Sequence, residues 1–161
     1  MNADELIFAR RILAADDDPI LCRLISDFLV KDGFAVDTVS DGEQAWDALQ
    51  HGHYDLLVTD NEMPHLTGVK LIERMRQAGM SLPVIMASTS FSVDSVRECP
   101  QLQIAAVVPK PFRRFELLNA VKTILPECGI ADTEHGSPNK SQAGPPTKRQ
   151  RPEPNLNLCH H

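Results

Sequence analysis

Five short strand-like segments alternate with five stretches of helical apolar spacing, and this alternation limits the fold more than any other feature of the sequence. The strand-like segments are RRILAA (10–15), FAVDTV (34–39), YDLLVTD (54–60), LPVIMAS (82–88) and IAAVV (104–108). Strands that alternate with helices form a parallel sheet, with right-handed crossovers and helices on both faces. We therefore expect an α/β fold with a doubly wound, five-stranded parallel sheet and five helices.

The helical stretches carry start and stop signals. Pro19 stands where a first helical turn needs no N–H donor, and Asp32-Gly33 is a typical helix end. The stretch VDSVREC before Pro100 predicts only a short helix. The apolar positions that define the other four helices are Ile20, Leu21, Leu24, Ile25, Phe28 and Leu29; Ala45, Trp46 and Leu49; Val69, Leu71, Ile72 and Met75; and Phe115, Leu118, Val121, Ile124 and Leu125.

The composition changes near Pro126, which sets the expected domain boundary. Residues 127–161 are rich in Gly, Ser, Pro, Gln and Asn, and seven of these 35 residues are apolar. Such a segment cannot bury enough surface to offset its ordering entropy. We expect a lead-in at 1–9, one domain at 10–126 and a disordered tail at 127–161. The tail sequences KRQR and CHH are interpreted as solvated chain rather than as binding motifs.

The charge of the chain argues against nucleic-acid binding. The formal net charge is −6, and the four acids and four bases of residues 127–161 cancel, so residues 1–126 carry all of it. An acidic body is poorly suited to a phosphate backbone. No stretch approaches the roughly 20 apolar residues of a membrane span, and the N-terminus has no apolar signal core. We expect a cytoplasmic protein with free thiols at Cys22, Cys99, Cys128 and Cys159, because none of them forms a CxxC pair.

Polar side chains stand at the carboxyl ends of four expected strands, where α/β sheets of this kind place their sites. Asp16 and Asp17 follow the first strand, Asp60 the third, Ser88 the fourth and Lys110 the fifth. Each has a simpler explanation alone: a helix cap, a turn hydroxyl or a solvated lysine. The five together, in this order, are far more specific than any one of them.

Three carboxylates brought to one edge repel one another. Two unit charges about 4 Å apart interact by roughly 4 kcal/mol at an effective dielectric constant near 20, and one lysine does not neutralise three such groups. A divalent cation resolves the conflict, and all-oxygen ligands with room for water favour Mg²⁺. Mg²⁺ beside a carboxylate, a hydroxyl and an ammonium suits phosphoryl transfer, in which the carboxylate attacks and forms an aspartyl phosphate.

The motifs around these residues resemble the receiver domain of bacterial two-component response regulators. They are Asp16-Asp17 after ILAA, Asp60 in DNEMPHLTG, Ser88 after PVIMA, and KPF from Lys110. The resemblance spans about residues 10–126 and implies a flavodoxin-like sheet of strand order 2-1-3-4-5. With no second domain pattern after residue 126, we expect a stand-alone, single-domain receiver.

The resemblance assigns roles to these side chains. It makes Asp60 the phosphoacceptor, with Ser88 bonding the phosphoryl group and Lys110 pairing with it. It also implies a cis peptide bond from Lys110 to Pro111, although X-Pro bonds in general are cis in only about 5–6% of cases. The implied Mg²⁺ ligands are Asp16 (largely through water), Asp17, Asp60 and the backbone carbonyl of Glu62.

The resemblance also implies partners. The donor is a phosphohistidine on a sensor histidine kinase or a histidine phosphotransfer protein. The output is a protein-binding surface on the predicted helix near 93–99, the strand near 104–108 and the last helix, read by a downstream protein target. We expect a monomer or a weak phosphorylation-dependent dimer, with neither nucleic acid nor membrane among its partners. We expect a phosphoacceptor that assists its own phosphorylation and dephosphorylation, not an enzyme.

Three positions depart from the family pattern. Val107 stands where the family usually has an aromatic residue that reports phosphorylation. Thr89 is bulkier than the small residue that often follows the site hydroxyl, so we expect slow entry of small phosphodonors. Glu62 adds an acid near the metal and is expected to alter the lifetime of the phosphoryl group.

Two rival functions remain open from the sequence. A haloacid-dehalogenase-type phosphatase would use Asp16 as nucleophile and Asp18 as acid, but Ile20 replaces the threonine that such enzymes usually carry. That interpretation also leaves the Asp60 motif unexplained, whereas capping of the first helix explains Asp18 well. The second rival, an interaction module with a vestigial site, is disfavoured because all five key positions keep competent chemistry.

Overall fold

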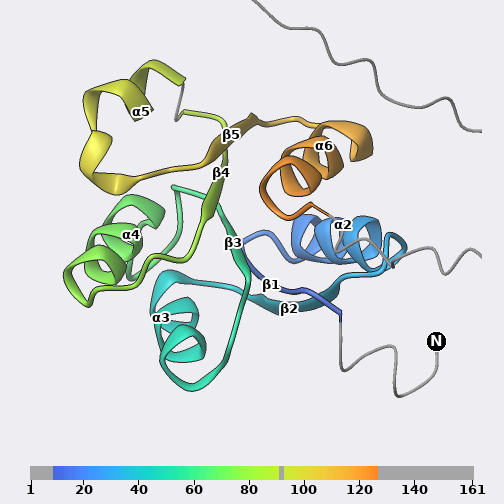
Figure 1. The fold of residues 1–161 in the computed structure, drawn as a ribbon, viewed down its shortest axis with the longest axis horizontal. Helices are drawn as coiled ribbons and strands as arrows, with labels where there is room; N and C mark the ends of the chain where they lie inside the picture. Colours follow the sequence, from blue (N-terminus) through green and yellow to red (C-terminus); the bar gives the residue numbers. More distant parts are fainter. Residues whose placement is uncertain (1–8, 91–92, 127–161) are drawn as a thin grey trace, which may run out of the picture. The chain divides into compact units, whose positions relative to one another are not determined.

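A computed structural model describes residues 9–90 and 93–126, which contain a single five-stranded parallel sheet (Figure 1). The strand order is β2-β1-β3-β4-β5, so the predicted fold class and strand order are confirmed. The lead-in before residue 9 and the tail from 127 lie outside the described residues, and their predicted boundaries stay predictions. The strands are β1 (Arg11–Ala15), β2 (Ala35–Val39), β3 (Leu56–Thr59), β4 (Val84–Ser88) and β5 (Ala106–Pro109).

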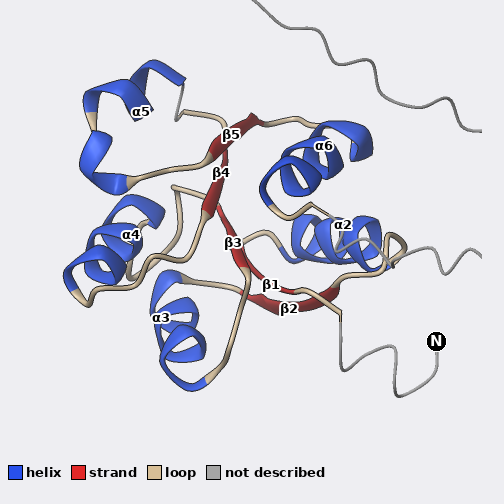
Figure 2. Cartoon of the chain, in the orientation of Figure 1, coloured by secondary structure: helices blue, strands red, loops and turns tan. Residues whose placement is uncertain are grey.

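Helices cover both faces of the sheet, as Figures 1 and 2 show. α2 (Pro19–Val30) and α6 (Arg114–Ile124) pack on one face. α3 (Gly42–His51), α4 (Gly68–Gln77) and α5 (Val93–Glu98) lie on the other face, together with a short 3-10 helix, η1 (Pro100–Leu102). Each of the five predicted helices is present.

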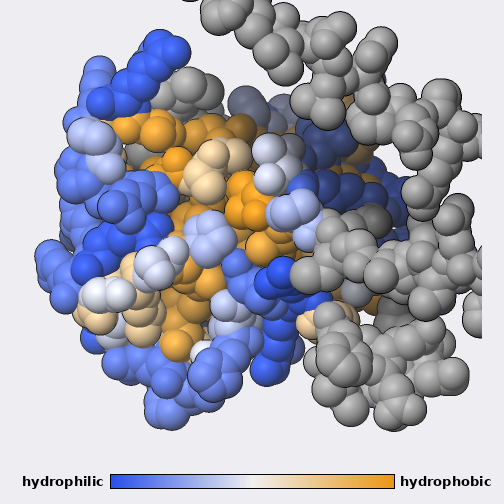
Figure 3. All heavy atoms as spheres, viewed as in Figure 1, coloured by the Kyte–Doolittle hydropathy of each residue, from blue (hydrophilic) through white to orange (hydrophobic). Residues whose placement is uncertain are grey.

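The central strands are buried from both sides. Every residue of β3 and β4 is buried, and so is all of β1 after Arg11, whereas the edge strands β2 and β5 are partly exposed. Apolar residues accordingly show through the middle of the molecule in Figure 3, between hydrophilic helix surfaces. Pro109 ends the edge strand β5, where its missing N–H costs no ladder hydrogen bond. The continuous apolar runs of the sequence thus mark the strands that support the site.

Several boundaries differ from the prediction, and each strand begins one or two residues after its expected start. The fifth strand begins at Ala106 rather than 104, although the Ala105 N–H already donates to the Val84 carbonyl at 2.9 Å. Pro100 does more than stop the preceding helix, because it also opens η1, where a first-turn proline is tolerated. These differences lie at element ends, where tertiary contacts decide the last residue.

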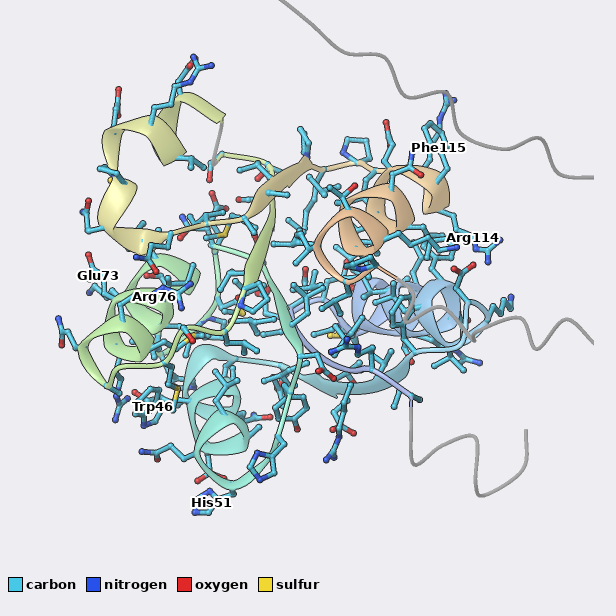
Figure 4. The ribbon with its side chains drawn as sticks, viewed as in Figure 1. Trp46, His51, Glu73, Arg76, Arg114 and Phe115 are labelled. Atoms are coloured by element: carbon cyan, nitrogen blue, oxygen red, sulfur yellow. The ribbon has the colours of Figure 1, made fainter. Side chains whose placement is uncertain are left out.

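Two apolar residues in the helical patterns face solvent. Ile20 is 78% exposed near the start of α2, and Phe115 is 54% exposed near the start of α6. Helical spacing correctly placed both residues in helices, but it did not distinguish the turns that the sheet covers from those that it leaves open. Figure 4 shows Phe115 on the outer side of α6.

The carboxyl end of α4 is held by one guanidinium. Arg76, labelled in Figure 4, donates to backbone carbonyls of the segment before β4 and of the segment around η1. Burial lowers the pKa of Arg76 from its ordinary value. The planar guanidinium has enough N–H groups to serve several acceptors at once, which an ammonium does less well. The four bonds go to Leu102 (3.0 Å), Met80 (2.8 Å), Leu82 (3.0 Å) and Gln103 (3.3 Å).

Among the residues that the structure describes, no helix combines the length and the apolar character that a membrane crossing requires.

Candidate functional site

The sheet register brings three aspartates to one edge. Ala15 of β1 lies opposite Thr59 of β3, so the residues that follow each strand are neighbours. The Asp60 N–H donates to the Ala15 carbonyl at 2.9 Å. One carboxylate oxygen from each of Asp16, Asp17 and Asp60 lies within 4.8 Å of the other two. The predicted convergence at the strand ends is therefore present.

This cluster suits a hard cation. Carboxylate oxygens are the ligands that Mg²⁺ and Ca²⁺ prefer, and Asp17 is exposed while Asp16 and Asp60 are buried, so solvent reaches one side. A site with few protein ligands and a side open to water suits Mg²⁺, whereas Ca²⁺ prefers a cage of six to eight oxygens. The donor set is thus chemically matched to the ion expected from the sequence.

Lys110 bridges two of the three aspartates. Its Nζ lies 2.7 Å from Asp16 Oδ2 and 3.0 Å from Asp60 Oδ2, and its side chain is 13% exposed. The ammonium reaches them because Lys110 follows β5, whose pairing continues as the Lys110 N–H donates to the Ser88 carbonyl at 3.1 Å. One cation therefore supplies part of the charge that the cluster needs.

The buried charges shift pKa values in opposite ways. Burial raises the pKa of Asp16, and the hydrogen bond from Lys110 opposes that rise without cancelling it. Burial alone would lower the pKa of Lys110, but the hydrogen bonds to Asp16 and Asp60 raise it above its ordinary value. Lys110 is therefore firmly protonated at neutral pH and is available as a fixed positive charge.

Both oxygens of Asp16 already have partners. Oδ2 binds Lys110, and Oδ1 accepts the Asp18 N–H at 3.0 Å. The Asp16 carbonyl accepts the Cys22 thiol, with Sγ at 3.2 Å. Asp18 itself is the N-cap of α2, since its Oδ1 accepts the Ile20 N–H at 2.8 Å, as the sequence predicted. Asp16 therefore holds the Lys110 ammonium with one oxygen and the backbone just before α2 with the other.

The loop from Asp60 to α4 passes close to two glycines. A Cβ on Gly68, the first residue of α4, would overlap the backbone oxygen of Asp60. A Cβ on Gly42, the first residue of α3, would overlap the backbone oxygen of Leu66. Glycine at position 68 therefore lets the start of α4 approach the backbone of Asp60.

Asn61 is a residue that the sequence motifs did not single out. Its N–H donates to Asp60 Oδ1 at 2.6 Å, while its side-chain Oδ1 accepts the Val69 N–H at 3.2 Å. An asparagine eight positions before the residue whose N–H it accepts lies outside the usual cap spacing. Only the three-dimensional path of the loop reveals this link.

The remaining predicted residues lie as follows. Ser88 is buried at the end of β4, and Glu62 is exposed on the loop after Asp60. Thr89 is exposed directly after Ser88. Val107 lies in β5 opposite Met86 and packs against the α3–α4 side of the core.

The Lys110-Pro111 peptide bond is cis, as predicted.

Comparisons with known proteins agree with this geometry. The sequence profile of the response regulator receiver domain matches residues 12–122. The transcriptional regulatory protein TctD of Salmonella typhimurium is 36% identical over 118 residues, covering 71% of this chain and 51% of TctD. The sensor histidine kinase RcsC of Escherichia coli is 34% identical over 100 residues, covering 62% of this chain and 10% of RcsC.

A solved structure shares the fold. Response regulator TrrA of Thermotoga maritima, in complex with Mg²⁺–BeF, superposes with a TM-score of 0.64 at 28% identity, covering 71% of this chain and 98% of TrrA. The chain spans about half of TctD and about a tenth of RcsC, so it corresponds to one module of those longer proteins. The match to the profile, the fold and the acidic cluster at the strand ends lead to one conclusion: the chain belongs to the response regulator receiver domain family.

Proposed function

We propose that Asp60 accepts a phosphoryl group from a phosphohistidine on a sensor histidine kinase or a histidine phosphotransfer protein. The observation that carries this proposal is the Lys110 ammonium, shared between Asp16 and Asp60 at the carboxyl edge of the sheet. It stands beside the Asp60 carboxylate, which is the proposed nucleophile, and at a position where phosphoryl oxygens would gather charge. The proposed transfer makes the chain a phosphoacceptor that assists its own modification, not an enzyme.

The phosphoryl transfer forms one bond to phosphorus and breaks another. A carboxylate oxygen of Asp60 forms a bond to phosphorus while the phosphorus–nitrogen bond of the phosphoimidazole breaks, and the imidazole leaves with the electron pair and takes up a proton. Lys110 moves from its contact with the Asp60 carboxylate to pair with a phosphoryl oxygen. The Ser88 hydroxyl, held at the end of β4, hydrogen-bonds another phosphoryl oxygen.

We propose Mg²⁺ as the ion of the acidic cluster, held by Asp17, Asp60 and the Glu62 carbonyl, and by Asp16 largely through water. A bound Mg²⁺ supplies neutralisation of the phosphoryl oxygens. The residues themselves do the rest: Asp17 and Asp60 fix the charge at the sheet edge, and Asp16 holds Lys110 in reach.

Removal of one ligand tests the metal site. Asp17→Asn is expected to weaken Mg²⁺ binding at least about tenfold and to slow phosphoryl uptake in parallel, because one ligand charge is lost. The measurement is a Mg²⁺ titration by calorimetry, followed by uptake from acetyl phosphate at each Mg²⁺ concentration.

The matched control is Asp18→Asn. It removes the same charge one residue away, and Asn caps a helix as well as Asp does. Its Mg²⁺ affinity is expected to stay within about twofold of the wild-type value, since a solvent-exposed charge has a screened effect. Equal weakening in both variants would show that net charge, not ligation by Asp17, sets the affinity.

Thr89 is proposed to restrict small donors. Thr89→Ala is expected to raise the rate of phosphorylation by acetyl phosphate a few-fold, because it removes bulk next to Ser88 without touching the carboxylates. Stopped-flow measurement with saturating Mg²⁺ checks this. Identical rates for the two proteins contradict the idea.

The proposed output is a switched protein-binding surface on α5, β5 and α6, read by a downstream protein. Val107 lies in β5 at the position where the family usually has an aromatic reporter. A signal from Asp60 to the surface therefore needs another route in this chain.

A further inference from the structure

Asn61 joins the phosphoacceptor to the next helix through three hydrogen bonds. Its backbone N–H donates to Asp60 Oδ1 at 2.6 Å. Its backbone carbonyl accepts the Gly68 N–H at 3.1 Å, and its side-chain Oδ1 accepts the Val69 N–H at 3.2 Å. The same residue thus binds the carboxylate on one side and the first turn of α4 on the other.

The bond to Asp60 depends on the charge of the carboxylate. An N–H donor to an ionised acceptor forms a shorter and stronger bond than one to a neutral acceptor, and 2.6 Å is short. When Asp60 becomes an acyl phosphate, its carboxyl group loses that charge and the bond weakens. Because the Asn61 carbonyl and side chain are fixed to α4, a shift of this peptide reaches the helix start directly.

The first turn of α4 relies on Asn61. Unpaired N–H groups at a helix start need outside acceptors. Thr67 supplies one, but its Oγ1 lies 3.4 Å from the Lys70 nitrogen, which is a long hydrogen bond. Asn61 supplies the other two, at Gly68 and Val69.

α4 in turn contacts the single tryptophan of the chain. The Arg74 guanidinium lies 4.4 Å from the Trp46 ring centroid and 3.1 Å from Glu43 Oε2, so α4 and α3 are joined by a cation–π contact and an ion pair. Trp46, labelled in Figure 4, is 9% exposed and belongs to the same buried cluster as Met63 of the loop after Asp60. A movement of the loop or of α4 therefore changes the surroundings of the indole.

We propose that Asn61 is a positioning residue that couples the charge state of Asp60 to the first turn of α4, with the Trp46–Arg74 contact as its readout. This inference rests on the proposed function, since it requires Asp60 to be phosphorylated. It gives the chain a route of transmission that does not pass through position 107.

Three full-length variants test it: Asn61→Ala, Asn61→Asp and Thr67→Ala. Asn61→Ala keeps the backbone N–H that binds Asp60 but loses the side-chain acceptor for Val69. It is expected to slow phosphorylation by phosphoramidate with Mg²⁺ roughly tenfold, because that side chain no longer fixes the peptide that orients the Asp60 carboxylate. The change in Trp46 emission on phosphorylation is expected to fall by at least about half. Asn61→Asp keeps the acceptor oxygen and is expected to restore most of the emission change.

Thr67→Ala is the matched control, since it removes the other cap of the same helix without touching Asp60. It is expected to lower stability to urea as Asn61→Ala does, while leaving the phosphorylation rate and the emission change within about twofold. If Asn61→Ala and Thr67→Ala behave alike in both readouts, Asn61 is an ordinary helix cap and the proposal is overturned.

A measurement on the wild-type chain needs no variant. Phosphorylation is expected to speed amide hydrogen exchange at Gly68 and Val69 several-fold relative to Lys70, whose partner is Thr67. Equal exchange changes at all three amides, or an unchanged Trp46 emission on phosphorylation, overturn the proposal. A wild-type chain that takes up no phosphoryl group from any donor instead removes the proposed function itself.

Discussion

Replacing Asp60 by Asn is expected to abolish phosphoryl uptake from both phosphohistidine and acetyl phosphate. The amide is a far weaker nucleophile than the carboxylate, and Asp60 is the residue that contacts both Lys110 and the Asn61 N–H. Intact-mass spectrometry after incubation with donor and Mg²⁺ gives the result directly. The fold is expected to survive, because Asn has the same shape and removes one charge from a repelling cluster.

The same variant separates the proposed function from the phosphatase alternative. A haloacid-dehalogenase-type mechanism would phosphorylate Asp16, so Asp60→Asn would keep its label. Asp18→Asn provides the complementary test, since that mechanism needs Asp18 as its acid, whereas here Asp18 caps α2. Label retained in Asp60→Asn and lost in Asp18→Asn would reverse the assignment.

Gly68→Ala is expected to destabilise the domain by about 3 kcal/mol and to disturb the phosphoacceptor. The new Cβ would overlap the backbone oxygen of Asp60, a group that cannot rotate away, so the loop or α4 must shift. Helix propensity alone predicts the opposite sign, since Ala stabilises a helix by about 1 kcal/mol relative to Gly. Urea unfolding measures the loss, and uptake from acetyl phosphate measures the displacement of Asp60.

Gly79→Ala is the control for that substitution. Gly79 has a φ of +77° and no atom within 4 Å of its potential Cβ, so Ala meets only the backbone cost of this conformation, about 1 kcal/mol. It is expected to leave phosphoryl uptake unchanged. Similar losses of stability and uptake in both variants would show that the contact with Asp60 is not the cause.

The sequence was sufficient for the framework of the site. Runs of apolar residues ending on Asp16, Asp60 and Ser88 predict buried strands with polar ends, and a parallel sheet must bring such ends to one edge. The cis bond at Pro111 followed from the family resemblance. These features depend on the local residue pattern and on the order of strands and helices along the chain, and both can be obtained from the sequence.

Contacts that depend on the path of a loop were not predictable. The bonds from Asn61 to Asp60 and Val69 require the chain to fold back over eight residues, and no local spacing encodes that turn. The solvent exposure of Ile20 and Phe115 was not predicted, for a related reason. Helical periodicity describes a helix alone, whereas burial depends on how far the neighbouring layer extends over it.

Arg76 has a mechanical consequence for α4. The four carbonyls around its guanidinium fix the carboxyl end of the helix to segments on either side of β4. A helix of 10 residues is about 15 Å long, so with that end fixed, a shift of 1 Å at the end near Asp60 corresponds to a tilt of roughly 4°. With its carboxyl end held by Arg76, α4 would tilt about that end. A small displacement near Asp60 would then change the direction of the whole outer face of α4. A lysine at position 76, with fewer and less rigid donors, would hold the carboxyl end less firmly, and the helix would slide instead of tilting.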